Sequence, residues 1–175
     1  EATTCNGNVS APQIQVTGGA TYLGSDHLTD GMLIRLNQAA PAGAFFAGWN
    51  AEPLPASSAV TAIHHPRGDA RMVSTGQKLS EDGVNHEVGW LIGTTEGGSS
   101  GSGLFTIAAS GAYELRGGLY GGFASCANDG DLGNTNNRDY YSRLDQDFAW
   151  MSTWLLSGPS LFENGFEATV PSASP

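Results

Sequence analysis

Short runs of apolar or alternating residues recur along most of the chain, and they have the pattern of β-strands. Each run is bounded by Gly, Pro, Ser or Asn, the residues that favour turns. The runs cover residues 12–19, 30–36, 44–50, 58–66, 71–77, 86–93, 103–109 and 113–122. Many of them are spaced about ten residues apart, which is typical of β-barrels and β-sandwiches. The pattern predicts an all-β fold.

One late segment has the period of a helix instead. Its apolar residues recur at i, i+4, i+7 and i+11, and they are Leu144, Phe148, Met151 and Leu155. This spacing places them on one face of an amphipathic helix. A Gly-Pro pair at 158–159 ends the pattern. We therefore predict a C-terminal α-helix over 144–158, followed by a polar tail over 159–175.

Composition and charge narrow the class of protein. Of 175 residues, 39% are hydrophobic, 14% are charged and 25 are glycine, which indicates a globular protein with a core and many turns. The formal net charge of −10 leaves nothing to neutralise phosphates, so we expect no nucleic-acid partner. No apolar run approaches the roughly 18 residues that a membrane-spanning helix needs, so we expect no membrane partner. We also expect a monomer.

The start of the chain and its composition bear on where the protein works. The sequence does not begin with Met and has no signal-peptide pattern, so we interpret it as a mature form or a fragment. Few lysines and many glycines suit an exported protein in an oxidising compartment, and we expect it to be secreted, either extracellular or periplasmic. The two cysteines, Cys5 and Cys126, could bond to each other or to partners outside this chain.

Signals for a metal or cofactor are weak. There is no Cys-x-x-Cys pair, so we do not expect a structural zinc site. Asp129, Asp131 and Asn134 offer oxygen ligands at the short spacing that calcium uses. The segment lacks the closing Glu of a calcium-binding loop, and we interpret it as a solvated surface loop. We expect no metal and no cofactor.

The stretch Gly98-Ser99-Ser100-Gly101-Ser102 carries the candidate chemistry. By composition alone it could be a flexible linker. It is flanked, however, by strand-like runs at 86–93 and 103–109, and a Gly/Ser run between two strands is a turn that needs unusual backbone angles. Such a turn can present a serine as a nucleophile, and this is the reading we favour.

The all-β pattern, the Gly-x-Ser-Gly turn and the closing helix together resemble the chymotrypsin-like serine proteases. The similarity is greatest to the bacterial lysyl endopeptidase branch, whose segments are matched in order across almost the whole chain. The matching segments are FFAGWNAE, SAVTAIHHPRGD, GTTEGGSSGSGLF, GGLYGGFASC and RDYYSRL. The resemblance implies a chymotrypsin-like double β-barrel. It also implies a serine endopeptidase that cleaves after basic residues, Lys or Arg, through an acyl-enzyme.

The resemblance assigns the nucleophile to Ser100, and not to Ser99 or Ser102. A serine hydroxyl needs a neighbouring base to become a good nucleophile. The resemblance places two N–H groups that would face the oxyanion at Gly98 and Ser100. It also implies that Asp30 orients the histidine and stabilises its charged form. The alternative is that Asp30 is a turn residue ahead of a strand and that Ser100 belongs to an ordinary polar turn.

A substrate pocket is also implied. Trypsin-like enzymes keep a pocket aspartate where this chain has Thr94 and Thr95, whereas the lysyl endopeptidase branch keeps its acid in an Asp-Tyr-Tyr segment, here at Asp139. A buried carboxylate there would select a basic P1 side chain that compensates its desolvation. Alternatively, Asp139 pairs with Arg138 or Arg143, or caps the helix.

Other residues complete the predicted substrate site. Tyr120 stands where lysine-specific members can carry a histidine, which leaves the choice between Lys and Arg open. Gly121 matches the edge that pairs with the substrate backbone, where a small residue admits an extended peptide. Thr95 borders the pocket by the same resemblance. We expect the four tryptophans to be core or helix-face residues, and of these Trp90 is the one best placed to reach the substrate cleft.

The catalytic histidine is the missing element. In the resembled family the order is His, Asp, Ser, and the expected Ala-His-Cys segment is not present. Of the four histidines only His27 precedes Asp30, within the same expected loop. His64 and His65 match a family segment outside the triad, where structural or substrate-side roles are expected. We interpret His86 as a solvated strand residue.

We therefore expect the C-terminal portion of a two-barrel enzyme, with an incomplete first barrel. Residues 1–52 would be the remainder of the first barrel and carry the triad Asp, and residues 53–143 would form the second barrel with the nucleophile and the S1 pocket. By resemblance, Cys5 and Cys126 match cysteines whose partners lie near the N-terminus and are not in this chain. Without its histidine the chain would be a poor catalyst. The alternatives are an inactive protease-like domain that binds peptide or protein, and a carbohydrate-binding module.

Overall fold

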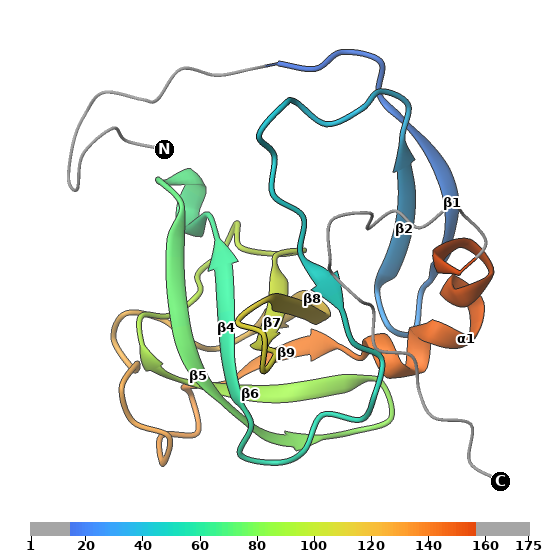
Figure 1. The fold of residues 1–175 in the computed structure, drawn as a ribbon. Coiled ribbons are helices and arrows are strands. Elements are labelled where there is room, and N and C mark those ends of the chain that lie inside the picture. The colour runs from blue at the N-terminus through green and yellow to red at the C-terminus, as the bar shows by residue number, and fades with distance from the viewer. Residues whose placement is uncertain (1–14, 157–175) are drawn as a thin grey trace, which may run out of the picture.

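A computed structural model describes residues 15–156 as a β-hairpin, a β-barrel and one α-helix (Figure 1). The hairpin consists of β1 (Ala20–Asp26) and β2 (Gly31–Leu36). The other strands are β3 (Gly48–Trp49), β4 (Ala59–His64), β5 (Met72–Glu81), β6 (Asn85–Ile92), β7 (Gly103–Ile107), β8 (Tyr113–Gly122) and β9 (Asp139–Ser142). A short 3₁₀ turn, η1 (Pro66–Gly68), follows β4, and α1 (Leu144–Leu155) follows β9.

Six strands close into a barrel in the order β4, β5, β6, β9, β8 and β7. All of these pairs are antiparallel, and the pairing of β8 with β9 completes the ring. The short β3 adds to β8 in parallel. Closure removes the open edges that would otherwise attract other strands. The predicted all-β fold with a closing helix is confirmed, and one of its barrels is complete.

Inward-facing side chains of the closing strands fill the barrel. On β6, Val88 and Trp90 are both fully buried, at the period of two that a strand imposes. The ring of Trp90 meets Tyr141 of β9 edge to face, with centroids 6.2 Å apart. The whole cluster consists of Leu54, Val60, Ala62, Val88, Trp90, Leu104, Leu119 and Tyr141. Each large side chain buried here stabilises the fold by about 1.5–3 kcal/mol, so the strands that carry the site have a rigid support.

A second apolar cluster joins α1 to the barrel. Leu144 and Met151 are buried in it with Trp49, and Phe148 and Leu155 pack against its edge. The rings of Trp49 and Phe148 have centroids 5.1 Å apart. The four residues that the sequence placed on one helix face are therefore the ones that pack, and this prediction is confirmed. α1 also packs against β1 and β2, so it holds the hairpin to the barrel (Figure 1).

Most of the predicted strands are confirmed. The predicted run over 30–36 is β2, and the runs between 58 and 122 are β4 to β8. The described part of the run over 12–19 is not a strand. Gly18 and Gly19 have φ values of 122° and 68°, which an extended strand does not contain.

Strands β1 and β9 were not predicted from the sequence, and a third strand is shorter than predicted. β9 is only four residues long, and it forms because β6 and β8 both supply hydrogen-bonding partners. β1 forms as the antiparallel partner of β2. The strand predicted over 44–50 is reduced to Gly48–Trp49, and Phe45 is 97% exposed. An apolar run outside the reach of a partner strand does not become a strand.

The hairpin keeps an uncovered apolar face. Tyr22, Met32, Ile34 and Leu36 are between 47% and 64% exposed. Among the described residues, no helix has the length and apolar character to cross a membrane.

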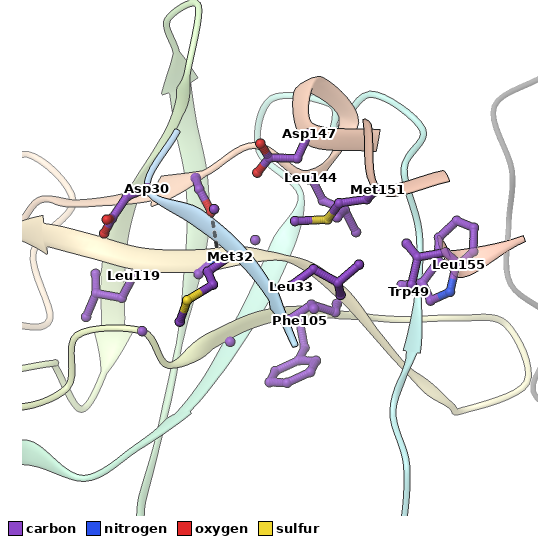
Figure 2. A pocket seen from close by; sticks show the side chains of 17 residues that line it. Asp30, Met32, Leu33, Trp49, Phe105, Leu119, Leu144, Asp147, Met151 and Leu155 are labelled. Atoms are coloured by element: carbon purple, nitrogen blue, oxygen red, sulfur yellow. Dashed lines mark hydrogen bonds between the residues drawn. The ribbon is translucent and has the colours of Figure 1, made fainter. Parts of the chain in front are cut away.

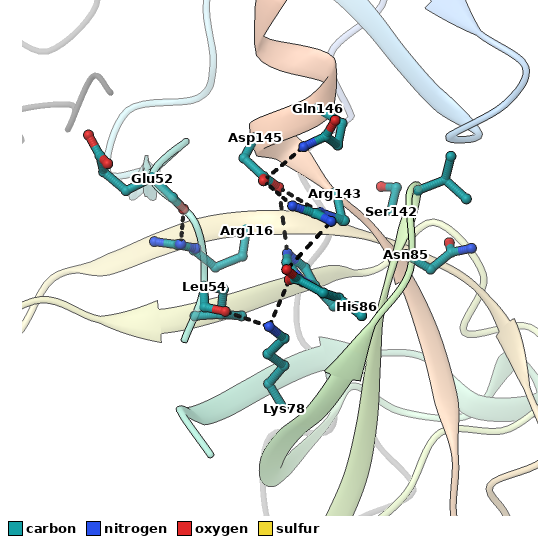
Figure 3. Close-up of polar contacts among 12 residues, drawn as sticks. Glu52, Leu54, Lys78, Asn85, His86, Arg116, Ser142, Arg143, Asp145 and Gln146 are labelled. Carbon is teal, nitrogen blue, oxygen red and sulfur yellow. Dashed lines mark hydrogen bonds and ion pairs between the residues drawn. The ribbon is translucent and has the colours of Figure 1, made fainter. Parts of the chain in front are cut away.

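A balanced group of charges lies where α1 meets the barrel (Figure 3). His86 is 1% exposed, with its Nδ1 3.5 Å from Glu81 Oε2 and its Nε2 4.0 Å from Asp145 Oδ1. Lys78 Nζ lies 2.7 Å from Glu81 Oε2, and Arg143 Nη2 lies 2.5 Å from Asp145 Oδ2. Two cations thus balance two carboxylates around the imidazole. The expectation that His86 is a solvated strand residue is wrong, because β6 directs it beneath the start of α1.

We expect His86 to make the protein less stable in acid. Burial lowers the pKa of His86 from its ordinary value of 6.5 to about 4. Between these two values the unfolded chain binds more protons than the folded one, so the free energy of unfolding falls as the pH falls, by about 3 kcal/mol. Urea denaturation across this pH range measures the effect. The variant H86Q should lose this part of the pH dependence, and a variant that keeps it would contradict the assignment to His86.

Candidate active site

Residues 98–102 form an ordered turn between β6 and β7, and they are not a linker. The Ser99 N–H donates to the carbonyl oxygen of Glu96 at 2.9 Å. The Gly101 N–H donates to the carbonyl oxygen of Leu119 on β8 at 2.8 Å. The turn is therefore bonded both to itself and to the neighbouring strand of the barrel.

Ser100 lies exposed in this turn, between two residues of left-handed conformation. The φ values are 98° at Gly98 and 79° at Gly101, and glycine adopts such angles without the steric cost that a Cβ brings. The Ser100 side chain makes no hydrogen bond within the part of the chain that the structure describes. Its hydroxyl therefore faces outward, where another molecule can reach it.

The peptide groups beside Ser100 are oriented by the loop after β4. The Arg67 N–H donates to the carbonyl oxygen of Gly97 at 2.8 Å. In a trans peptide the C=O and N–H point in opposite directions, so this bond turns the Gly98 N–H away from Arg67. Neither the Gly98 N–H nor the Ser100 N–H donates to any residue between 15 and 156. Two N–H groups of this kind beside a hydroxyl can stabilise an oxyanion that develops there.

Interactions of the Arg67 and Glu96 side chains also connect the loops around Ser100. The guanidinium of Arg67 forms an ion pair with the carboxylate of Glu96. Glu96 Oε1 also accepts a hydrogen bond from the Cys126 N–H at 3.3 Å. Arg67 itself has a φ of 52°, an uncommon angle for a residue with a side chain. The loops that follow β4, β6 and β8 are thus joined beside Ser100.

His64 supports the turn from within the barrel. It is 2% exposed, its Nδ1 lies 2.9 Å from Ser99 Oγ, and its Nε2 lies 3.0 Å from Ser74 Oγ. Ser74 Oγ in turn donates to the carbonyl oxygen of Thr94 at 3.1 Å. Burial lowers the pKa of His64, against the attraction of Asp139. A neutral imidazole therefore lies between two hydroxyls directly beneath the residue that precedes Ser100.

Asp139 is a buried carboxylate at the start of β9. It is 1% exposed, and its Oδ2 accepts hydrogen bonds from Trp90 Nε1 at 2.6 Å and from Thr95 Oγ1 at 2.5 Å. Burial raises the pKa of Asp139, while these two hydrogen bonds act in the opposite direction. A Cβ at Gly122 would overlap this carboxylate, so the glycine leaves the room in which Asp139 sits. No cation among the described residues pairs with it.

The alternatives considered for Asp139 are wrong. Arg138 pairs with Glu87, Nε to Oε1, at 3.1 Å, and Arg143 pairs with Asp145. The N-cap residue of α1 is Arg143, and it makes no side-chain capping bond. A desolvated carboxylate without a cation is an arrangement that a positively charged ligand would stabilise.

The remaining predicted substrate residues lie in the loop after β6 and at the end of β8, the strand that pairs with β9. Thr95 is buried and bonded to Asp139. Tyr120 is 62% exposed near the end of β8, and Gly121 follows it with open space where a Cβ would be. Trp90 is a core residue, as expected for the tryptophans, but it does not reach a cleft, because it is fully buried and its Nε1 is bonded to Asp139.

Asp30 lies in the turn between β1 and β2, and it is exposed there with a φ of 58°. It borders a cavity of about 460 Å³ between the hairpin, α1 and the barrel. Gly101, the residue after Ser100, borders the same cavity. Figure 2 shows Asp30 and Leu119 at one end of the cavity and Trp49 at the other. Asp30 and the turn over residues 98–102 therefore face a common space, although no hydrogen bond joins them.

A second buried carboxylate holds the Asp30 turn in place. Thr29 Oγ1 donates to Asp147 Oδ1 at 2.6 Å, and Trp150 Nε1 donates to the same oxygen at 3.1 Å. Burial raises the pKa of Asp147, whereas these two bonds lower it. A Cβ at Gly31 would overlap the Asp147 carboxylate. The residues on both sides of Asp30 are thus packed against α1.

Asp147 was not identified from the sequence, and His64 was expected only to have a structural or substrate-side role without a named partner, although a signal for each was present. Asp147 falls at i+3 from Leu144 and at i−4 from Met151, which is a charged position on the apolar face of the helix. His64 alternates with Val60 and Ala62 on the buried face of β4. A polar residue at a core position usually has a specific hydrogen-bonding partner.

None of the four histidines contacts the candidate nucleophile. Of the two buried ones, His64 bonds to Ser99 and His86 lies in the charged group under α1. His65 is exposed, with its Nδ1 3.0 Å from the carbonyl oxygen of Asp69, and His27 is exposed in the turn before Asp30. No described histidine forms a hydrogen bond with Ser100 or Asp30.

The other predicted features are local. Asp131 Oδ1 accepts from the Gly133 N–H at 2.8 Å, and Asn134 Oδ1 accepts from the Asn136 N–H at 3.0 Å. These are turn contacts of a surface loop. Between residues 15 and 156 there is no group of three or more His, Cys, Asp or Glu side chains that could hold a metal ion. Cys126 is exposed and forms no disulfide within the described residues, and Cys5 lies outside them.

Known proteins are similar to this chain in sequence or in fold. Residues 1–142 match the family model described as "Lysyl endopeptidase, C-terminal domain". A lysyl endopeptidase from Pseudomonas aeruginosa is 41% identical over 162 residues, which cover 89% of this chain and 33% of that protein. The chain thus spans about a third of the length of this curated relative. The Rv3671c protease from M. tuberculosis, in its active form, aligns with a TM-score of 0.51 at 14% identity, covering 87% of this chain and 60% of that one, which shows the fold alone.

Proposed function

Because the chain belongs to the lysyl endopeptidase family, we propose that it is part of a serine endopeptidase that cleaves peptide bonds after basic residues, Lys or Arg. In this proposal Ser100 is the nucleophile and forms the acyl-enzyme. The observation that carries it is the ordered turn in which an exposed Ser100 lies beside two N–H groups without a partner among the described residues. Acyl transfer needs hydrogen-bond donors beside the nucleophile to stabilise the oxyanion, whereas a linker needs none.

The reaction follows from this geometry. The Ser100 hydroxyl attacks the scissile carbonyl carbon and gives its proton to a base. The carbonyl oxygen becomes an oxyanion that the N–H groups of Gly98 and Ser100 stabilise. The amine leaves with the proton returned by the base, and water then hydrolyses the acyl-enzyme in a second round of the same steps.

The base is not found among the described residues. Since no described histidine bonds to Ser100, and since the chain spans only about a third of its curated relative, we place the base on a segment of the protein outside this sequence. Asp30 would orient that base across the cavity that it shares with Gly101. In this proposal residues 1–52 belong to a first barrel, which is completed by the segment of the protein that carries the base. Residues 53–143 form the second barrel.

Specificity would come from Asp139. Its carboxylate is buried, bonded to Thr95 and Trp90, and has no cation beside it among the described residues. A lysine or arginine at P1 would supply the missing positive charge. Tyr120 and Gly121, on the neighbouring end of β8, would contact the substrate backbone. The substrates would be polypeptides, and we propose that the protein works outside the cell or in the periplasm.

Active-site labelling of the full-length protein tests this proposal. A fluorophosphonate, which reacts only with an activated serine, should modify Ser100, and peptide mass spectrometry should locate the label there. Heat-denatured protein is the control and should take no label. Digestion of a denatured test protein should give fragments that end in Lys or Arg. A label on a different residue would contradict the assignment of Ser100.

The second candidate is a protein-binding domain without activity. It is favoured by one observation, that the described residues contain no base for Ser100. It predicts that the full-length protein takes no label and cuts no substrate, but still binds peptides that contain lysine or arginine. The labelling experiment therefore separates the two functions directly.

A further inference from the structure

We propose that His64, neutral and protonated on Nε2, is a positioning residue that fixes the nucleophile turn through the Ser99 hydroxyl. Its catalytic consequence rests on the proposed function, whereas its structural part does not. His64 does not contact the substrate in this proposal. It acts through Ser99, whose backbone lies between the two residues that provide the oxyanion-binding N–H groups.

The protonation state follows from the chain of hydrogen bonds. Ser74 Oγ donates its hydrogen to the carbonyl oxygen of Thr94 at 3.1 Å, so it can only accept from His64. The contact of 3.0 Å between His64 Nε2 and Ser74 Oγ is therefore an Nε2–H donating to Ser74. A neutral imidazole with its hydrogen on Nε2 has a lone pair on Nδ1. The contact of 2.9 Å to Ser99 is then the Ser99 hydroxyl donating to Nδ1.

The hydrogen bond at the Ser99 end of this series has the same donor-to-acceptor direction. The Glu96 N–H lies 3.3 Å from Ser99 Oγ and has only a hydrogen to donate. Ser99 Oγ thus accepts from Glu96 and donates to His64, so all of its contacts are satisfied. The hydrogen bonds run in one direction from Glu96 through Ser99, His64 and Ser74 to Thr94. Both ends lie in the segment that leads into the nucleophile turn.

Burial explains why the imidazole stays neutral. Desolvation is the largest influence on His64 and lowers its pKa, His65 acts in the same direction, and Asp139 acts against both. A charged imidazole would donate from both nitrogens. Ser99 Oγ would then have to accept from Nδ1 as well as from the Glu96 N–H, and its hydrogen would have no acceptor. The observed contacts therefore fit the neutral form.

The nucleophile turn needs such a support. Gly98 and Gly101 have few conformational limits of their own, so the peptide groups between them could rotate at little cost. Ser99 is 1% exposed, and its side chain anchors the middle of this flexible stretch to β4. The Arg67 bond to Gly97 holds the stretch from the other side. Loss of the His64 contact should free the Gly98 and Ser100 N–H groups to leave the orientation that an oxyanion requires.

Two variants of His64 separate positioning from bulk stability. Asparagine places its Oδ1 at the same number of bonds from the backbone as Nδ1, so H64N keeps an acceptor for Ser99. Glutamine places its Nε2 where the imidazole has its own, so H64Q keeps the donor for Ser74 and loses the acceptor for Ser99. Asparagine and glutamine amides both donate and accept hydrogen bonds, so the two variants have similar polarity.

We expect H64Q to react with the fluorophosphonate about 10–100-fold more slowly than the full-length wild type, with KM for a peptide substrate little changed. H64N should stay within about fivefold of the wild type. Amide hydrogen exchange at Ser99 and Gly101, whose N–H groups donate to Glu96 and Leu119, should be faster in H64Q than in H64N. His65, exposed and bonded only to the backbone of Asp69, is the matched control, and H65Q should behave as the wild type in each measurement.

Imidazole ¹⁵N chemical shifts of the wild type give a test that needs no variant and no activity. They should show Nε2 protonated and Nδ1 unprotonated near neutral pH. A hydrogen on Nδ1 would overturn the proposal, and so would equal reaction and exchange rates in H64Q and H64N. If the wild type itself takes no label, the proposed function fails, and the shifts and exchange rates still decide whether His64 holds the turn.

Discussion

Replacing Ser100 by alanine is expected to abolish cleavage by the full-length protein while the fold stays intact. Loss of the nucleophile in a serine protease removes roughly 10⁶-fold of the turnover. The exposed Ser100 side chain makes no hydrogen bond within the described chain, so its removal should change the free energy of unfolding by less than about 0.5 kcal/mol. Steady-state kinetics on a lysyl peptide and urea denaturation measure the two effects.

The neighbouring serine is the control for this variant. Ser102 lies two residues later, and its N–H donates to the Ser99 carbonyl oxygen at 3.1 Å, a backbone bond that alanine retains. We expect S102A to keep its activity within about tenfold. If S102A were inactive and S100A active, Ser102 would be the nucleophile, and the assignment of Ser100 would be contradicted.

Replacing Asp139 by asparagine is expected to remove the preference for basic substrates. The carboxylate is buried without a cation among the described residues, so a lysine or arginine at P1 would be bound chiefly by this charge. We expect kcat/KM for such substrates to fall by about 10³-fold or more, and kcat/KM for a substrate with an apolar P1 residue to change little. Competition between two peptides that differ only at P1 measures this ratio directly.

The free energy of unfolding of D139N should not fall together with its activity. Trp90 and Thr95 donate to the same carboxylate oxygen, and an asparagine oxygen can accept both bonds. D139N replaces a desolvated charge by a neutral group, so the free energy of unfolding without substrate should be unchanged or higher. D129N removes the same charge at an exposed position and is the matched control, for which we expect wild-type specificity. A loss of preference in D129N as well would assign the effect to net charge.

Local pattern alone was enough to identify much of this fold. The short apolar run over 86–93 is visible in the sequence, and it correctly predicted β6. The spacing of Leu144, Phe148 and Met151 likewise predicted the packed face of α1. The glycines at 98 and 101 indicated a turn. These features could be predicted because each depends on the periodicity or backbone freedom of a few neighbouring residues.

The supports of the site could not be found in this way. His64 and Ser99 are 35 residues apart, Thr95 and Asp139 are 44 apart, and Thr29 and Asp147 are 118 apart. The short β9, which begins with Asp139, exists only because β6 and β8 lie on either side of it. Which polar groups become buried partners depends on how the barrel closes and where α1 packs.

The sequence by itself thus determined the class of fold, the turn that carries Ser100 and the candidate catalytic and substrate-binding residues. Only the tertiary structure decided that His64 holds this turn, that Asp139 is buried without a cation among the described residues, and that Asp147 holds the residues beside Asp30. The reason is physical. Turns and amphipathic faces follow from local sterics and periodicity, whereas a buried polar contact forms between distant segments, once folding has removed both groups from water.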